Sequence, residues 1–286
     1  MTASAKVNLA LEVLGKRPDG YHELATVMQT VDLADRLVLE DADELALTTS
    51  SSQIPVDKEN IALRAALALR DAARVERGVK IRLVKRIPVA AGLGGGSSNA
   101  AAVLLGLNRL WNLRWTGARL AEIAETLGMD VPFFLAGGVA LGTGRGERLT
   151  RLSGMPLALV LVNPGTPLST AAVYGRVTPA MYSGGGKAEM MAAALGARRR
   201  SKVAASLYNG LEAAAAGVSP EVTRIRAALM AAGALGALMS GSGPTVFGIA
   251  RSFEQARQIR ARLARASWGC WAVRSVSGPA VRIRAA

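Results

Sequence analysis

The sequence predicts an α+β protein of two domains, a mixed α/β domain followed by a ferredoxin-like α+β domain. Its 286 residues are enough to build two hydrophobic cores. Strand-like and helix-like segments alternate through the first half, around a glycine-rich loop. In the second half they follow the order strand, helix, strand, strand, helix, strand, which is the split βαβ pattern. We therefore expect domains at residues 1–153 and 154–286, with the last strand free to return to the first domain.

The elements of the first half are predicted from hydrophobic periodicity. Alternating apolar residues predict a strand over residues 5–13, whose other face carries Lys6 and Asn8. Residues 15–20 have the composition of a turn. The remaining expected strands are 24–33, 36–40, 79–83, 137–143 and 146–149, and the expected helices are 60–77, 99–111 and 118–127.

The second half is predicted in the same way. Ser219 and Pro220 have the chemistry of an N-cap and first helical residue, and Ser252 with Gln255 forms a capping box. These signals start helices over about 220–233 and 252–266. The expected strands are 157–162, 234–239, 245–250, 270–276 and 280–284, and further helical residues fall within 171–195 and 203–216.

Composition limits the classes of function. The formal net charge of +14 favours polyanionic partners, so nucleic acid is a rival to a small phosphorylated ligand. The basic residues are dispersed, however, and none of the few aromatic residues interleaves with them as base stacking requires. The apolar stretch 227–250 is broken by Gly and Pro, the start lacks signal-peptide features, and Cys270 is the single cysteine. We expect a cytoplasmic protein without a membrane span and without nucleic acid as a partner.

The most informative segment is the loop over residues 88–99, Pro-Val-Ala-Ala-Gly-Leu-Gly-Gly-Gly-Ser-Ser-Asn. Its glycines allow positive φ and bring backbone N–H groups close to an anion, and the following helix directs its N-terminal dipole to the same point. The loop has neither the Lys-Ser/Thr of a Walker loop nor the acidic partner of a dinucleotide fold. From the glycines alone, a flexible strand–helix connection is an alternative.

The whole string Pro-x-x-x-Gly-Leu-Gly-x-x-Ser-Ser resembles the phosphate loop of the GHMP kinases. Five more segments support the resemblance in order along the chain. Residues 5–9 resemble the first family motif, 128–134 the catalytic-acid segment, and 240–245 the third motif, a second glycine loop. Residues 17–24 and the glycine turn 142–147 resemble the diphosphocytidyl-methylerythritol kinases within this superfamily. Two departures are Gly210, where relatives carry an acid, and residues 183–202, which match no motif.

The resemblance implies roles that the residues alone leave open. Asp130 orients the attacking hydroxyl and accepts its proton late, and Lys6 keeps Asp130 ionised and helps to place the same hydroxyl, although in isolation they would be a helix N-cap and a solvated lysine. His22 reads the edge of cytosine, Tyr21 and Tyr174 stack on it, and Asn8 contacts substrate; by themselves His22 and Asn8 are ordinary surface residues. The implied ATP site is Pro88, Gly92, Leu93, Gly94, Gly95, Gly96, Ser97, Ser98 and Asn99, with Gly241, Ser242 and Gly243 as the second glycine loop. Mg²⁺ would bind through the nucleotide phosphates, with Ser98 as the protein contact.

The implied activity is ATP-dependent phosphorylation of the 2-hydroxyl of 4-diphosphocytidyl-2-C-methyl-D-erythritol in non-mevalonate isoprenoid precursor biosynthesis. One alternative keeps the fold and changes the acceptor to another small alcohol, such as homoserine or mevalonate. Tyr21 and His22 argue against such an acceptor, because homoserine and mevalonate carry no base for these two side chains to bind. The alternative from another class is a basic nucleic-acid-binding protein. We expect a monomer or a homodimer.

Overall fold

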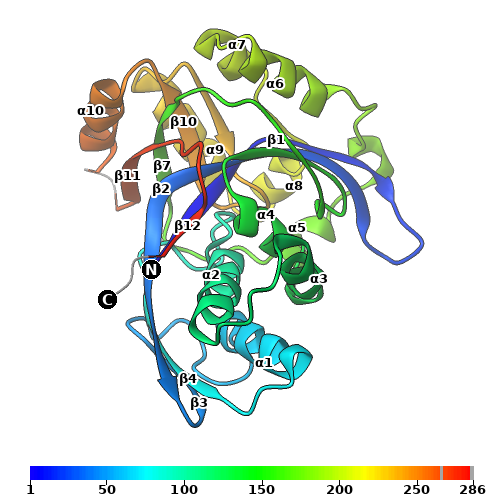
Figure 1. Ribbon diagram of the computed structural model, residues 1–286. Helices are drawn as coiled ribbons and strands as arrows, with labels where there is room; N and C mark the ends of the chain where they lie inside the picture. The colour runs from blue at the N-terminus through cyan, green and yellow to red at the C-terminus, as the bar shows by residue number, and fades with distance from the viewer. Residues whose placement is uncertain (265–266, 284–286) are drawn as a thin grey trace.

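The computed structural model describes residues 1–264 and 267–283 and is organised around one long antiparallel hairpin (Figure 1). Its strands are β1, Thr2–Lys16, and β2, His22–Ala42. The sequence predicted two strands in place of β2, because polar Asp35 interrupts the apolar pattern. The pairing of β1 with β2 shifts register between Ser4 and Ala5. This shift accommodates the irregular residues of β2, so that β2 continues past Asp35 as one strand.

The hairpin is the centre of an eight-stranded sheet with the path β12-β1-β2-β4-β3. Strands β4, Gly78–Val84, β5, Val139–Gly144, and β6, Arg148–Arg151, lie close to the predicted positions. Two short strands were not predicted: β3, Leu45–Thr49, and β8, Tyr208–Asn209. The last strand, β12, Val281–Arg282, pairs with β1, so the end of the chain does return to the first sheet. The predicted end of this strand, at residue 284, lies outside the described residues.

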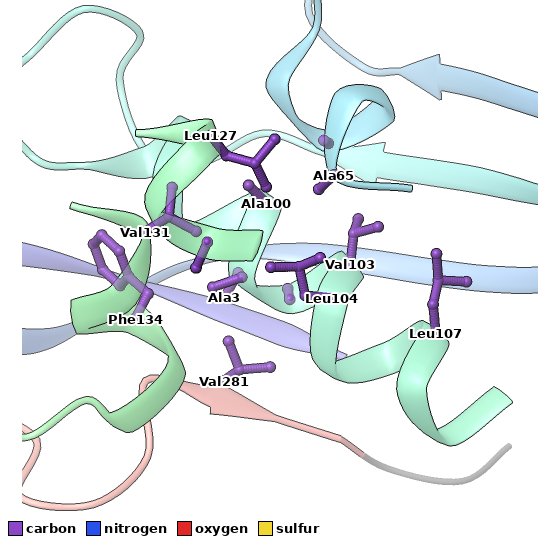
Figure 2. Packing of buried hydrophobic residues seen from close by; sticks show 14 of the residues in the cluster. Ala3, Ala65, Ala100, Val103, Leu104, Leu107, Leu127, Val131, Phe134 and Val281 are labelled. Atoms are coloured by element: carbon purple, nitrogen blue, oxygen red, sulfur yellow. The ribbon is translucent and has the colours of Figure 1, made fainter. Parts of the chain in front are cut away.

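One face of this sheet is covered by helices α1, Ile61–Ala73, α2, Gly95–Leu110, α3, Gly117–Leu127, and α4, Val131–Ala136. Figure 2 shows side chains of α2, α3 and α4 converging with Ala3 of β1 and Val281 of β12 in one buried cluster. Helix α2 begins four residues before the predicted start. Its first turn is therefore made of the glycine string itself.

The second sheet has four antiparallel strands in the order β11-β7-β10-β9. They are β7, Ala158–Asn163, β9, Gly236–Met239, β10, Val246–Ala250, and β11, Gly269–Arg274, with helices α9, Glu221–Ala231, and α10, Phe253–Leu263. This is the predicted ferredoxin-like order. The Ser252 hydroxyl accepts from Gln255 N at 3.1 Å, which is half of the predicted capping box. In α9, Pro220 rather than Ser219 is the capping residue, and the predicted end of α10 at residue 266 lies outside the described residues.

Short helices connect the two sheets: α5, Thr170–Tyr174, the 3₁₀ turn η1, Pro179–Met181, α6, Lys187–Gly196, α7, Arg200–Ala205, and α8, Glu212–Ala216. The buried carboxylate of Glu12 on β1 anchors this region. It accepts from Ala188 N at 2.7 Å, in the first turn of α6, and from the Ser183 hydroxyl. An anion at a helix N-terminus is stabilising, so Glu12 ties the segment without a motif to the central hairpin.

Strand β1 is buried on both faces, which corrects the expectation of a polar, solvated face. The side chains of Val7 and Leu9 pack against the second sheet, while Lys6 and Asn8 on the other face are only 4% and 3% exposed. Figure 1 shows the hairpin between helices α1–α4 and the sheet of β7, β10 and β11. In the described part of the chain, no helix combines the length and apolar character needed to cross a bilayer.

Candidate active site

A cleft of about 1100 Å³ lies where the two halves of the molecule meet. One end is lined by the two glycine loops, Lys6 and Asp130, and the other end by Tyr21, His22 and Tyr174. Most of the predicted site residues, from six separated segments, therefore line one cavity. Its lining, with glycine loops and a charged pair as well as aromatic rings, suits a ligand that carries both phosphates and a ring.

The phosphate loop needs glycine at two positions. Gly92 has φ +73°, and a Cβ there would lie 2.0 Å from the Ser240 carbonyl oxygen of the second glycine loop. Gly94 has φ +68° and caps α2, and a Cβ there would lie 2.7 Å from the Phe134 ring. The first helical hydrogen bond runs from Ser98 N to Gly94 O, so the amides of residues 95–97 have no partner within the helix. These N–H groups and the helix dipole form an anion cradle.

Two predicted loop residues do not line the cleft. Leu93 is a buried core residue, and its carbonyl accepts from Lys6 N at 3.0 Å. Ser98 is fully buried, and its hydroxyl donates to the Ser4 carbonyl at 2.7 Å. Ser98 therefore connects α2 to β1, and the hydroxyl beside the cleft belongs to Ser97. The helical rotation of about 100° between successive residues turns the second serine away.

The second glycine loop is positioned by Asn209, which sequence reasoning left without a role. The buried Asn209 side chain donates to the carbonyls of Met239 and Gly241, both at 2.8 Å. The Ser240 hydroxyl in turn donates to Gly92 O at 2.9 Å, so the two glycine loops are bonded to each other. The available signal was Asn209 itself, a polar residue followed by glycine inside the segment 203–216 that was predicted to contain helix.

Lys6 and Asp130 form an ion pair, with 3.3 Å between Nζ and Oδ2. Asp130 stands at the N-cap position of α4, but its carboxylate accepts no capping hydrogen bond. The structure therefore does not support the alternative in which Asp130 serves as a helix N-cap. The Lys6 ammonium also donates to Asn8 Oδ1 at 2.6 Å. Asn8 donates to the Thr26 hydroxyl at 2.8 Å, which donates to Ala10 O at 2.7 Å. This chain of bonds fixes the Lys6 ammonium beside the Asp130 carboxylate.

The other end of the cleft is aromatic. The rings of His22 and Tyr174 have centroids 5.2 Å apart, and Tyr182 meets His22 edge-on at 6.3 Å. Burial lowers the pKa of His22, and the nearby Lys16 cation lowers it further, so the ring is neutral near pH 7. Burial raises the pKa of Tyr174, and the Asp130 carboxylate adds to this effect. The ring of Tyr21 is 53% exposed at the rim, with the Arg145 guanidinium 5.2 Å from its centroid.

A buried ion pair behind the phosphate loop was also missed from the sequence. The fully buried Asp35 carboxylate accepts from the Lys85 ammonium, from the Asn99 side chain at 2.9 Å, and from Arg86 N and Ile87 N. Lys85 lines the cleft, and its ammonium lies near Gly95. This network places a fixed cation at the start of α2. Its one signal in the sequence was the acidic residue between two apolar strand segments.

The residues around the cleft suit a metal brought in by a nucleotide better than a resident metal. No group of three His, Cys, Asp or Glu side chains suited to a metal ion occurs in the described residues. The glycine loop suits phosphates because the amides of residues 95–97 have no partner within the helix, and glycine at 92 and 94 lets the loop pass close to Ser240 and Phe134. Mg²⁺ keeps most of its waters and binds mainly to substrate phosphates, so such a cradle is compatible with it.

Comparison with known proteins agrees with this geometry. The family model "GHMP kinases N terminal domain" matches residues 60–138, and "GHMP kinases C terminal" matches residues 191–269. The chain is 51% identical over 266 residues to a 4-diphosphocytidyl-2-C-methyl-D-erythritol kinase of Pelotomaculum thermopropionicum, covering 92% of this chain and 93% of the relative. It is 47% identical to the enzyme of the same name from Moorella thermoacetica, covering 92% and 94% of the two chains.

Solved structures extend the comparison. A crystal structure of 4-(cytidine 5'-diphospho)-2C-methyl-D-erythritol kinase matches with a TM-score of 0.85 at 41% identity, over 97% of this chain and 99% of that one. A homoserine kinase from Cytophaga hutchinsonii matches over 97% and 96% with a TM-score of 0.73 at 21% identity, which shows a shared fold alone. The nucleic-acid-binding alternative is not favoured. The chain belongs to the GHMP kinases and, within them, to the 4-diphosphocytidyl-2-C-methyl-D-erythritol kinase family.

Proposed function

We propose that this kinase transfers the γ-phosphoryl group of ATP to the 2-hydroxyl of 4-diphosphocytidyl-2-C-methyl-D-erythritol, releasing ADP. The observation that carries the proposal is the position of the Lys6–Asp130 pair in the cleft. It lies beside two bonded glycine loops, and the same cleft ends in the His22–Tyr174 pocket. A donor on the loops and a cytosine in the pocket would bring the hydroxyl between them to Asp130.

The residues of the cleft divide the work of phosphoryl transfer. Phosphoryl transfer needs positioning and charge stabilisation more than covalent chemistry. The amides of residues 95–97 and the Lys85 ammonium hold the donor phosphates. The Asp130 carboxylate orients the attacking hydroxyl and accepts its proton late, because a loose transition state needs little nucleophilic push. The Lys6 ammonium has three N–H donors, of which Asn8 and Asp130 engage two, and the third is directed to the same hydroxyl.

Three residues are proposed to recognise the base. The neutral His22 ring offers one donor and one acceptor, which matches the donor and acceptor edge of cytosine. Tyr174 lies against His22 and offers its ring face to the base, with Tyr21 proposed for the opposite face. Tyr21 sits at the rim, so it would turn inward on binding.

Mg²⁺ is part of the proposal. When bound to the nucleotide phosphates it would neutralise charge that develops during transfer. Ser97 is the hydroxyl of the phosphate loop that lies beside this position, whereas the Ser98 hydroxyl is committed to the Ser4 carbonyl.

The direct test is ADP release in a coupled assay with ATP and Mg²⁺, and with three acceptors in parallel: 4-diphosphocytidyl-2-C-methyl-D-erythritol, mevalonate and homoserine. We expect turnover with the first acceptor alone, and a new phosphomonoester on its 2-hydroxyl by phosphorus NMR. Turnover with mevalonate or homoserine at a comparable kcat/KM would overturn the assignment of the acceptor.

A matched pair of variants tests the base pocket. Tyr174→Ala should raise KM for the acceptor about 5- to 150-fold, since stacking contributes about 1–3 kcal/mol. The control, Tyr208→Ala, should leave this KM unchanged.

A cytoplasmic location is proposed as well. The donor is ATP, and the single cysteine, Cys270, is a free thiol, which is typical of a reducing compartment. The state of association remains the prediction made from the sequence, a monomer or a homodimer.

A further inference from the structure

A second cavity, of about 590 Å³, lies beside the first residues of the chain and strand β12. It is formed by the first residues of β1, the irregular part of β2 and residues close to the C-terminus, and it shares no lining residue with the active cleft. Its volume falls within the range of small-molecule sites. The kinase activity proposed above makes no use of it.

Sheet register places two arginines in a single row in this cavity. Thr2 of β1 is paired on one side with Arg36 of β2 and on the other side with Arg282 of β12. Residues directly opposite one another in antiparallel strands extend their side chains from the same face. Arg36 and Arg282 therefore flank Thr2 on that face, with their Cα atoms about 10 Å apart across two strand spacings. Both line the cavity.

A third arginine completes the set. Arg86 lines the same cavity, and its backbone is held in place because Asp35 Oδ1 accepts from Arg86 N at 2.7 Å. The backbone that carries the exposed Arg86 side chain is thus fixed by a partly buried hydrogen bond and does not belong to a free loop.

The positive charge of this cavity is only partly compensated. Over residues 1–264 and 267–283, no carboxylate lies within ion-pair distance of Arg36, Arg86 or Arg282, whereas other arginines, such as Arg77 and Arg224, have acidic partners. The one acidic residue that lines the cavity is Asp32, whose carboxylate accepts from Arg274 N at 2.8 Å. Three guanidinium groups around one cavity repel one another, and a bound anion would relieve that repulsion.

The chemistry of the lining identifies the class of anion. Guanidinium groups bind phosphate oxygens in pairs of parallel hydrogen bonds, and two or three of them suit a diphosphate better than a single carboxylate. Leu33 and Val276 provide an apolar part of the wall. We propose that this cavity, the arginine groove, binds a small organic diphosphate, with its phosphates on Arg36, Arg86 and Arg282 and its carbon portion against Leu33 and Val276.

Hydrogen bonds connect the lining of the arginine groove to the phosphate loop, so its occupancy should be sensed there. Ser4 lines the groove, and its carbonyl accepts the Ser98 hydroxyl in the first turn of α2. Asp35 bonds both Arg86 N and the Lys85 ammonium, which lines the active cleft. A ligand that shifts Arg86 or Ser4 therefore acts on the residues that hold the ATP phosphates, and this second part of the proposal predicts a changed KM for ATP.

The test is a calorimetric titration with inorganic diphosphate and with an alkyl diphosphate, in protein saturated with ADP so that the phosphate loop is already filled. We expect one site, with tighter binding of the alkyl diphosphate. The Arg36→Gln/Arg282→Gln double variant should bind about 10-fold more weakly, a loss of about 1.4 kcal/mol. Its control is Arg109→Gln/Arg199→Gln, which removes the same charge from two exposed arginines outside both cavities.

Each outcome supports or overturns the site. Equal weakening in both double variants would mean that net charge alone attracts the ligand, and disappearance of binding in ADP-saturated protein would move the ligand to the phosphate loop. Tight binding of a short oligonucleotide without binding of either diphosphate would also overturn it, in favour of nucleic acid. The KM for ATP is measured with and without diphosphate, with Mg²⁺ in excess over all phosphates. Diphosphate should change this KM in the wild type and not in the Arg36→Gln/Arg282→Gln variant. An unchanged KM would refute the second part.

Discussion

Replacing Gly92 by alanine tests whether the contact between the two glycine loops sets the geometry of phosphate binding. The new methyl carbon would lie 2.0 Å from the Ser240 carbonyl oxygen, where ordinary contacts begin at 3.4 Å, so the loops must separate by about 1.4 Å. A left-handed backbone adds about 1–2 kcal/mol of strain. A misplacement of about 1 Å in a reacting group costs on the order of 100-fold, and we expect kcat/KM for ATP to fall by about that factor.

Gly165→Ala is the matched control. Gly165 has a similar left-handed φ of +86°, but a Cβ there would have no neighbour within 4 Å, and the residue does not line the cleft. The control therefore carries the strain without the collision. It should lower the melting temperature by a few degrees and leave KM for ATP unchanged.

Steady-state kinetics of ADP release and thermal unfolding, measured on both variants, separate the two effects. The reasoning is refuted if folded Gly92→Ala protein keeps the wild-type kcat and KM. It is equally refuted if Gly165→Ala reproduces the kinetic loss, because backbone strain alone would then explain it.

Three other predictions concern the proton acceptor, the base pocket and the loop support. Asp130→Asn should lower kcat about 10²- to 10⁴-fold with the melting temperature within a few degrees of the wild type; near-normal turnover would exclude Asp130 as the acceptor of the proton. The lowered pKa of His22 means that KM for the acceptor should rise as pH falls below His22's ordinary value of 6.5 and through its lower folded value. Between these two pKa values the unfolded chain binds the proton before the folded chain does, so the free energy of unfolding also declines as pH falls and then levels off. His22→Gln should lose both the rise in KM and the decline in stability. If either pH dependence persists in this variant, it must be assigned to another group. Asn209→Asp removes two hydrogen-bond donors at constant shape and should lower kcat/KM for ATP about 10-fold. Its control, Asn108→Asp, disturbs a hydrogen-bonded turn outside the cleft lining and should lower stability only. Equal kinetic effects in these two asparagine variants would contradict the positioning role.

The local features of the fold were predictable from the sequence. The period-2 pattern of β4 and the helical periodicity of α3 gave nearly the observed bounds, because short-range periodicity reports the buried face directly. The Ser252 signal marked the start of α10 for the same reason, since a cap is a contact within one turn. The long β2 strand was predicted in two pieces, because a polar residue in a strand is ambiguous until its partners are known.

The chemistry of the site was predictable only where one short segment carries it. The glycine string specified an anion cradle, because positive φ and the missing Cβ are properties of the glycine residues themselves. The direction of the Ser98 hydroxyl was not predictable. It depends on how α2 packs on β1, which brings Ser4 within 2.7 Å across more than ninety residues of sequence.

The sequence by itself predicted the α+β class and the glycine-rich anion loop, since each depends on residue type and local spacing, and its resemblance to the GHMP kinases singled out Lys6, His22 and Asp130. Only the tertiary structure decided that Lys6 is buried and paired with Asp130, that Asp35 holds Lys85, and that Asn209 supports the second glycine loop. These contacts join residues far apart in the chain. Their existence depends on which faces of the β1–β2 hairpin the helices and the second sheet cover, and residue spacing carries no information about that packing.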